Sequence, residues 1–151
     1  MKRIPKFAVW TGGLVLLLVV LLVVWKVAAD RAGKNLADEI LHDRSTFEAF
    51  AVEMRGDEGS RLESEDAGPF GELMDFLAAY EVKKVKEPDG TDLAGGFELF
   101  VRSADRSASE HFIILEDSVY SSGTGHYEVV NGPIDLAWVR SFMDRLTPDP
   151  E

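Results

Sequence analysis

The feature that most constrains this chain is an uncharged stretch of 19 residues, 7–25, near the N-terminus. It contains an unbroken aliphatic run over residues 14–24. As a helix that rises about 1.5 Å per residue, the stretch reaches about 28 Å, close to the hydrocarbon thickness of a bilayer. Trp10 and Trp25 stand near its two ends, where indole rings favour the membrane boundary. The sequence therefore predicts an N-terminal transmembrane anchor within residues 1–29.

A cleaved signal peptide is the alternative interpretation of the same stretch. Lys2, Arg3 and Lys6 make the start of the chain basic, and Val27-Ala28-Ala29 offers small side chains for cleavage. The length favours the anchor, because the apolar core of a signal peptide is about 7 to 15 residues long. Positive charge flanks the stretch on both sides, with a small excess before it from the N-terminal amine. We expect a single-pass protein of the cell membrane with a cytoplasmic N-terminus and an extracytoplasmic domain, and both interpretations place the domain outside the cytoplasm.

The chain after the hydrophobic stretch is strongly acidic. It holds all 27 Asp and Glu but 12 of the 16 Lys and Arg, which is a formal charge of −15 from Asp30 onward. Such a charge repels nucleic-acid phosphates, so we expect no nucleic-acid partner. The chain has no cysteine, which removes disulfides, thiolate metal sites and cysteine nucleophiles.

The acidic part divides into three segments by composition. Residues 30–45 have few apolar positions and predict a juxtamembrane stalk with a short polar helix over residues 30–43. Residues 46–147 have the length of one ordinary compact domain. Two prolines end the last predicted element, so residues 148–151 form a tail.

The first half of the domain combines a hairpin and a helix. Residues 46–55 fit a strand by alternation and a helix by spacing, and the turn residues at 56–60 favour the strand, with 61–64 as its partner. Apolar residues at spacings of three and four then predict a helix over residues 69–79. Pro69 suits its first turn, where a missing amide donor costs little.

The second half of the domain is rich in strands and ends in a helix. A four-residue apolar repeat after Asn131-Gly132-Pro133 predicts the last helix, over residues 134–146. In the strand region Phe97, Leu99 and Val101 point to one face and Phe100 to the other. Gly, Asp, Ser and Pro clusters separate the predicted strands 81–86, 96–102, 110–116, 118–121 and 125–131. The predicted fold is α+β: a transmembrane helix, then a small antiparallel β-sheet with two helices packed on one face.

Several polar groups contain the residue types of a catalytic or metal site without the required spacing. Three histidines, at positions 42, 111 and 126, share no ligand-pair spacing, although His111 and His126 meet if their strands are neighbours. Ser122, His126 and Asp117 have the letters of a hydrolytic triad but no nucleophile elbow. Acidic side chains could supply oxygen ligands to calcium, but their spacing does not match a twelve-residue calcium loop. These candidates are Asp57, Glu58, Glu63, Glu65, Asp66, Asp89 and Asp92. We predict a protein without a catalytic, metal or cofactor site.

An interaction surface is the remaining candidate. Its members are Phe100, Tyr120, Tyr127, Lys83, Lys84 and Lys86. The lysines form either a patch for an acidic partner or a charged edge strand that resists pairing with another chain. The aromatic residues form either a binding surface or part of the core. The sequence thus favours a membrane-anchored extracytoplasmic binding or protein-interaction module without catalytic activity; the alternative is a cleaved, secreted small acidic effector or inhibitor.

Overall fold

The computed structural model of this chain describes residues 17–22, 24, 33–56, 60–86 and 93–147. The chain divides into two compact units, residues 1–32 and 33–151, and each is described by itself. In the first unit, residues 17–22 and 24 are helical. All of them are apolar, and the exposed fraction of each is more than one half. No helix in these described segments is long and apolar enough to cross a bilayer. The rest of the predicted transmembrane stretch lies outside the described residues.

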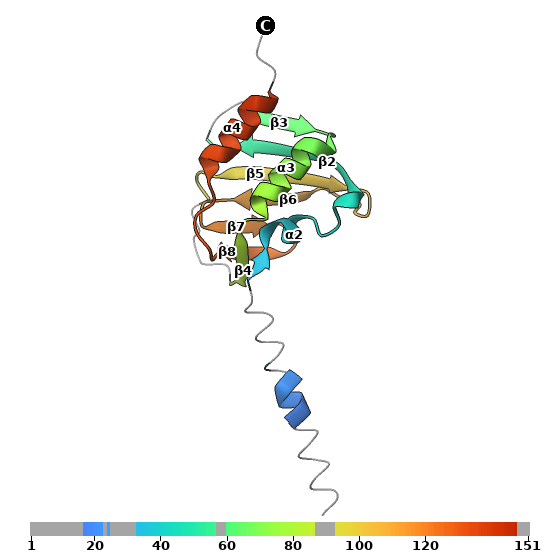
Figure 1. Ribbon diagram of the computed structural model, residues 1–151, viewed down its shortest axis with the longest axis vertical. Helices are drawn as coiled ribbons and strands as arrows, with labels where there is room; N and C mark the ends of the chain where they lie inside the picture. Colours follow the sequence, from blue (N-terminus) through green and yellow to red (C-terminus); the bar gives the residue numbers. More distant parts are fainter. Residues whose placement is uncertain (1–16, 23, 25–32, 57–59, 87–92, 148–151) are drawn as a thin grey trace, which may run out of the picture. The chain divides into compact units, whose positions relative to one another are not determined.

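The second unit is an α+β domain built on one eight-stranded antiparallel sheet, as predicted (Figure 1). The strands are β1 (Lys34–Asn35), β2 (Phe47–Met54), β3 (Arg61–Ser64), β4 (Glu81–Val85), β5 (Phe97–Ser103), β6 (Glu110–Ile114), β7 (Ser118–Ser121) and β8 (Gly125–Val129). Their spatial order is β1-β4-β8-β7-β6-β5-β2-β3. The helices are α2 (Leu36–Ile40), α3 (Ala67–Leu77) and α4 (Leu136–Leu146), with a 3-10 turn η1 (Arg44–Thr46).

The two long helices begin at aspartate caps. The Asp66 carboxylate accepts a hydrogen bond from the amide of Gly68 at 2.8 Å. The Asp135 carboxylate accepts from the amides of Ala137 at 3.0 Å and Trp138 at 3.1 Å. Short acidic side chains satisfy amides that have no partner inside the helix and favour the positive end of the helix dipole. Because of these caps, α3 begins earlier and α4 begins later, each by a few residues, than the apolar spacing alone predicts.

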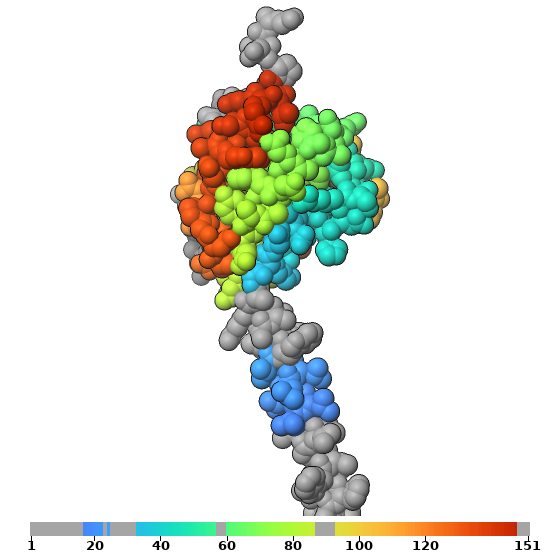
Figure 2. Space-filling view, in the orientation of Figure 1, coloured from blue at the N-terminus to red at the C-terminus, as the bar shows by residue number. Residues whose placement is uncertain are grey.

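All three α-helices pack on one face of the sheet, as predicted for α3 and α4 (Figure 1). The space-filling view shows α4, α3 and α2 side by side over this face (Figure 2). One continuous core joins the helices to the inward-facing strand residues. Its fully buried members include Ile40, Phe70, Leu73, Leu77, Phe97, Leu99, Val139 and Phe142. The core therefore fills the layer between the helices and the sheet.

The segment predicted as a polar stalk helix is part of this domain from Gly33 onward. Lys34 and Asn35 pair with β4, and α2 is only five residues long. Leu36 and Ile40 are 1% and 0% exposed, against the helix layer. The few apolar residues of this segment lie within about one turn of helix. A segment that short shows no repeating apolar pattern, so the sequence does not indicate that it is buried.

The ambiguous segment after η1 is a strand, as preferred from the sequence. β2 pairs with β3 on one side and with β5 on the other. Phe50, Val52 and Met54 face the core, and Ala49 and Ala51 face away from it. The alternation decides the structure here because two partner strands hold β2 on both edges.

No helix of the described segments covers the opposite face of the sheet, which we call the open face. Its residues alternate with the core residues along each strand. Directly paired positions run across it in the order Val85, His126, Tyr120, Ile113, Glu98, Glu53 and Arg61. One half of this row is therefore apolar and aromatic, and the other half is charged.

Candidate functional site

Two pairs of stacked rings lie on the open face. Phe100 and His111 are directly opposed on β5 and β6, with ring centroids 4.4 Å apart and planes 3° from parallel. Tyr120 and His126 are opposed in the same way on β7 and β8, at 4.1 Å and 17°. Cross-strand ring pairs of this kind stabilise a sheet and hold each other's orientation. The open face thus presents aromatic surfaces in fixed positions.

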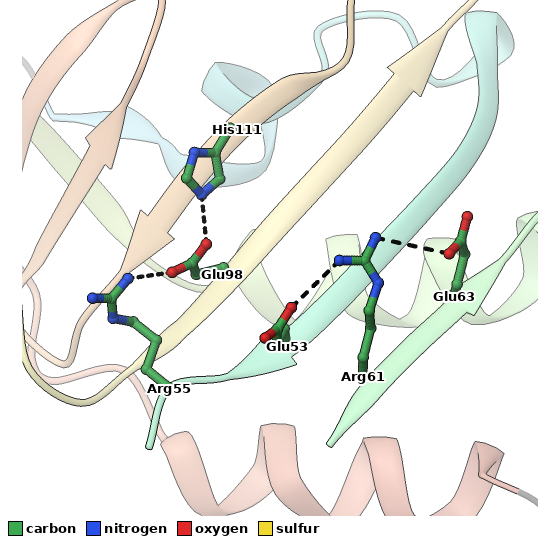
Figure 3. Close-up of polar contacts among 6 residues, drawn as sticks. All are labelled: Glu53, Arg55, Arg61, Glu63, Glu98 and His111. Carbon is green, nitrogen blue, oxygen red and sulfur yellow. Dashed lines mark hydrogen bonds and ion pairs between the residues drawn. The ribbon is translucent and has the colours of Figure 1, made fainter. Parts of the chain in front are cut away.

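A carboxylate locks the imidazole of the first pair in place (Figure 3). One oxygen of Glu98 lies 2.9 Å from Nε2 of His111. A carboxylate only accepts hydrogen bonds, so Nε2 of His111 carries the hydrogen. The other oxygen of Glu98 pairs with the guanidinium of Arg55, and all three side chains are about one-quarter to one-third exposed. The Arg55–Glu98–His111 network therefore fixes the ring that supports Phe100.

A second arginine approaches Phe100 from the other side. The guanidinium carbon of Arg61 lies 5.4 Å from the centre of the Phe100 ring. Arg61 comes from β3, beyond β2, whereas His111 comes from β6, so the Phe100 ring lies between the guanidinium and the imidazole. The same guanidinium is 3.4 Å from a Glu53 oxygen and 3.8 Å from a Glu63 oxygen (Figure 3). Contacts therefore run continuously from Arg55 to Glu63 across four strands.

A shallow hollow of about 130 Å³ lies beside Phe100. Ala49 and Ala51, which are 7% and 4% exposed, form its floor between larger side chains on β3 and β5. Arg61 and Arg102 also line it. Small-molecule pockets usually enclose about 300 to 1,000 Å³, so this hollow has the size of one amino-acid side chain rather than of a cofactor.

A second hollow of about 300 Å³ lies beside α4. Met54, Ser60, Met143 and two charged residues of α4, Arg140 and Asp144, line it. None of these described lining residues is aromatic, and none belongs to the Phe100 network.

His126 is buried although it belongs to the open face. It is 7% exposed, and neither ring nitrogen has a hydrogen-bond partner within the part of the chain that the structure describes. A buried polar group without a partner costs stability, and stacking on Tyr120 offsets part of that cost. The described residues contain no group of three or more His, Cys, Asp or Glu that could hold a metal ion.

The structure separates the residues that the sequence grouped into one interaction surface. Phe100, Tyr120 and Lys83 lie on the open face. Lys84 is paired with Tyr127, on the side of the helices. Lys86 is exposed just after β4, and β1 pairs only with the first two residues of β4, so the lysines follow an edge that β1 leaves uncovered.

Tyr127 belongs to the core layer instead. It is 4% exposed, and its hydroxyl donates to a Glu39 oxygen at 2.8 Å. Burial is the main reason why the pKa of the Tyr127 hydroxyl is raised; a hydrogen bond with Thr124 works against the rise, and the Glu39 carboxylate adds to it. Tyr127 therefore ties β8 to α2 and is not part of the open face.

The residue types of a hydrolytic triad are not brought together. The Asp117 carboxylate accepts from the hydroxyl of Ser118, and the Ser122 hydroxyl lies 3.4 Å from the carbonyl of His111. His111 and His126 are not on neighbouring strands, because β7 lies between β6 and β8. Four of the acidic calcium candidates lie outside the described residues: Asp57, Glu58, Asp89 and Asp92.

Sequence reasoning missed most of the Phe100 network. It placed Phe100 on the second face by alternation. It considered His111 as a metal ligand or general base and otherwise as a surface or half-buried side chain, and it gave Glu98 and Arg61 no role. The alternation of residues 97–102 was the available signal, since Glu98 must share a face with Phe100. Comparisons with protein-family models, with curated proteins and with solved structures find no match for this chain.

Proposed function

We propose that this protein is a membrane-anchored, extracytoplasmic protein-interaction module without catalytic activity, and that it binds its partner through the open face. The observation that carries the proposal is the Phe100 ring, which is held between His111 and Arg61 on a sheet face that the described helices leave uncovered. Rigid aromatic side chains that are fixed before binding lose little entropy on association and are frequent centres of binding energy.

The size of the site supports a macromolecular partner. The hollow beside Phe100 measures about 130 Å³ and accepts a single side chain. Around it, stacked rings and ion pairs spread over neighbouring strands. A broad face with one small recess suits a folded or extended polypeptide, which makes many contacts over a wide area.

Charge supports a basic partner. The acidic part of the chain has 12 Lys and Arg against 27 Asp and Glu. A net charge of this size attracts positively charged proteins from a distance and raises their rate of association at low salt.

The hydrophobic stretch supports the anchor. Its described residues, 17–22 and 24, are helical and expose apolar side chains along the whole described length. An exposed apolar surface of this kind calls for a lipid or protein environment.

Site-directed cross-linking tests the binding face. Because the chain has no native cysteine, a single introduced cysteine is the only site of labelling. Ser109 is exposed at the rim of the hollow, and Ser141 is exposed on α4, so Ser109→Cys and Ser141→Cys form a matched pair. Each full-length variant receives a photo-cross-linker in the membranes of the producing cell. We expect the position 109 probe to capture one reproducible protein, and Phe100→Leu to reduce that capture at least about threefold. Equal capture from position 141, or capture that is indifferent to Phe100→Leu, contradicts the proposal.

Two measurements separate the anchored protein from the secreted alternative. Protease added to intact cells should digest the domain and spare the N-terminal stretch if the domain is extracytoplasmic. The mass of the mature protein should include residues 1–29 if the anchor is retained. A new N-terminus near Asp30 would instead identify a secreted effector or inhibitor.

A further inference from the structure

Arg61 lies in a set of contacts that has the composition of a guanidinium-binding site. An aromatic ring lies 5.4 Å from its guanidinium carbon, and carboxylates of Glu53 and Glu63 lie 3.4 Å and 3.8 Å from its nitrogens. Aromatic faces and carboxylates are the groups with which arginine pairs at interfaces, since its planar cation stacks and donates hydrogen bonds at once. The protein's own side chain occupies these contacts.

That occupant is held loosely. The side chain of Arg61 is 48% exposed, and its two carboxylate partners are 46% and 69% exposed. Both nitrogen–oxygen distances are at the long end for an ion pair. Exposed ion pairs of this kind contribute little, because water screens the charges and long side chains lose entropy when they are held. Another guanidinium can therefore replace Arg61 at small cost.

The Phe100 ring does not depend on Arg61 for its support. Phe100 is supported from the opposite side by His111, which Glu98 and Arg55 hold in turn. Ala51, 4% exposed, fills the space below. When Arg61 swings into solvent, the Phe100 ring keeps its support from His111, and the hollow of about 130 Å³ is extended by the volume of the departed side chain.

We infer that Arg61 occupies, in the free protein, a site that takes an arginine side chain of a basic polypeptide partner. The inference rests on the proposed binding function and names the group that the open face recognises. Phe100 stacks on the incoming guanidinium, and Glu53 and Glu63 accept its hydrogen bonds. Arg61 thus lowers the affinity for arginine and is released when a partner binds.

Peptide binding to the full chain in detergent micelles tests this inference. The probe is fluorescein-labelled Gly-Arg-Gly-Arg-Gly-Arg, followed by anisotropy, with peptides that carry lysine or citrulline at the same positions for comparison. We expect Arg61→Ala to bind the arginine peptide about three- to fivefold more tightly than the unchanged chain. Adding Phe100→Leu to Arg61→Ala should weaken that binding about two- to fivefold.

Arg102→Ala is the matched control. It makes the same change in net charge, and Arg102 also lines the hollow, but its contacts are with Glu48 and Glu65. We expect Arg102→Ala to change the affinity much less than Arg61→Ala. Equal effects of the two variants, or an equal gain for the lysine peptide, would show attraction by net charge alone and overturn the inference. Cross-linking from position 109 that still depends on Phe100 would then leave the proposed function standing.

Discussion

At the scale of single residues, Tyr127 links two parts of the domain that are far apart in sequence. Its hydroxyl donates to Glu39 on α2, while its ring is buried between the sheet and the helices. A phenolate in this position would lose hydration and face a carboxylate, so the folded state favours the neutral form and the pKa of Tyr127 is raised. The same contact explains why Tyr127 is unavailable on the open face.

Tyr127 should make stability depend on pH at the alkaline end. The folded pKa lies above the ordinary value of 10.0, so the contribution is fully present below pH 10 and is lost as the pH rises through the folded pKa. Urea midpoints measured between pH 8 and 11 should fall for the unchanged chain and fall less for Tyr127→Phe. Tyr120→Phe alters a partly exposed tyrosine, so its urea midpoint should fall with pH as much as that of the unchanged chain. Parallel curves for Tyr127→Phe and the unchanged chain would contradict this assignment.

At the scale of elements, short-range signals predicted most of the domain. β7 has the predicted bounds, and β4, β5, β6 and β8 differ from prediction by one or two residues at their ends. Alternation and turn residues act over a few positions, so they are visible in sequence. Two pairings are not local: β4 joins β8, and β2 joins β5. These pairings depend on which faces become buried together, which no local pattern states.

Two glycines in different elements should respond in opposite ways to alanine. Gly71 lies inside α3, where an added Cβ meets nothing within 4 Å, and Gly71→Ala should stabilise the domain by up to about 1 kcal/mol. Gly96 enters β5 with φ +70°, and an added Cβ would lie 2.2 Å from the carbonyl oxygen of Ile114. Gly96→Ala should cost about 2 kcal/mol or more.

Chemical denaturation of both variants checks this pair. The free energies of unfolding come from urea curves with an unchanged slope, so that a shift in midpoint reports stability. Equal losses for Gly71→Ala and Gly96→Ala would mean that helix propensity and the close approach to Ile114 are not the controlling factors.

At the scale of the whole molecule, the domain carries its own core. The described core cluster begins at Leu36 and draws on every α-helix from α2 to α4. Trp138 stacks on Phe76 at 3.9 Å and on Phe142 at 5.3 Å, so its fluorescence reports the packing between α3 and α4. The unit from residue 33 onward therefore has the contacts that a cooperative fold requires.

A chain without residues 1–32 should fold with the stability of the full-length domain. Its Trp138 fluorescence should lose native character in one cooperative urea transition, at the midpoint that the full chain shows in detergent. Leu73→Ala in the same shortened chain should lower the free energy of unfolding by about 2 to 5 kcal/mol, because Leu73 is fully buried. A shortened chain without a cooperative transition would show that the N-terminal residues belong to the folding unit.

The sequence by itself determined the class of fold, the uncharged N-terminal stretch, the acidic surface charge and the face to which Phe100 belongs. Each of these follows from composition or from a period of a few residues. The tertiary structure alone decided that His111 stacks on Phe100 and that Arg61 reaches it from β3. Arg61 comes from a strand that is far from β5 in sequence, whereas His111 comes from the next strand. Which side chains meet depends on strand order and register, where a slip of one residue turns every side chain to the other face.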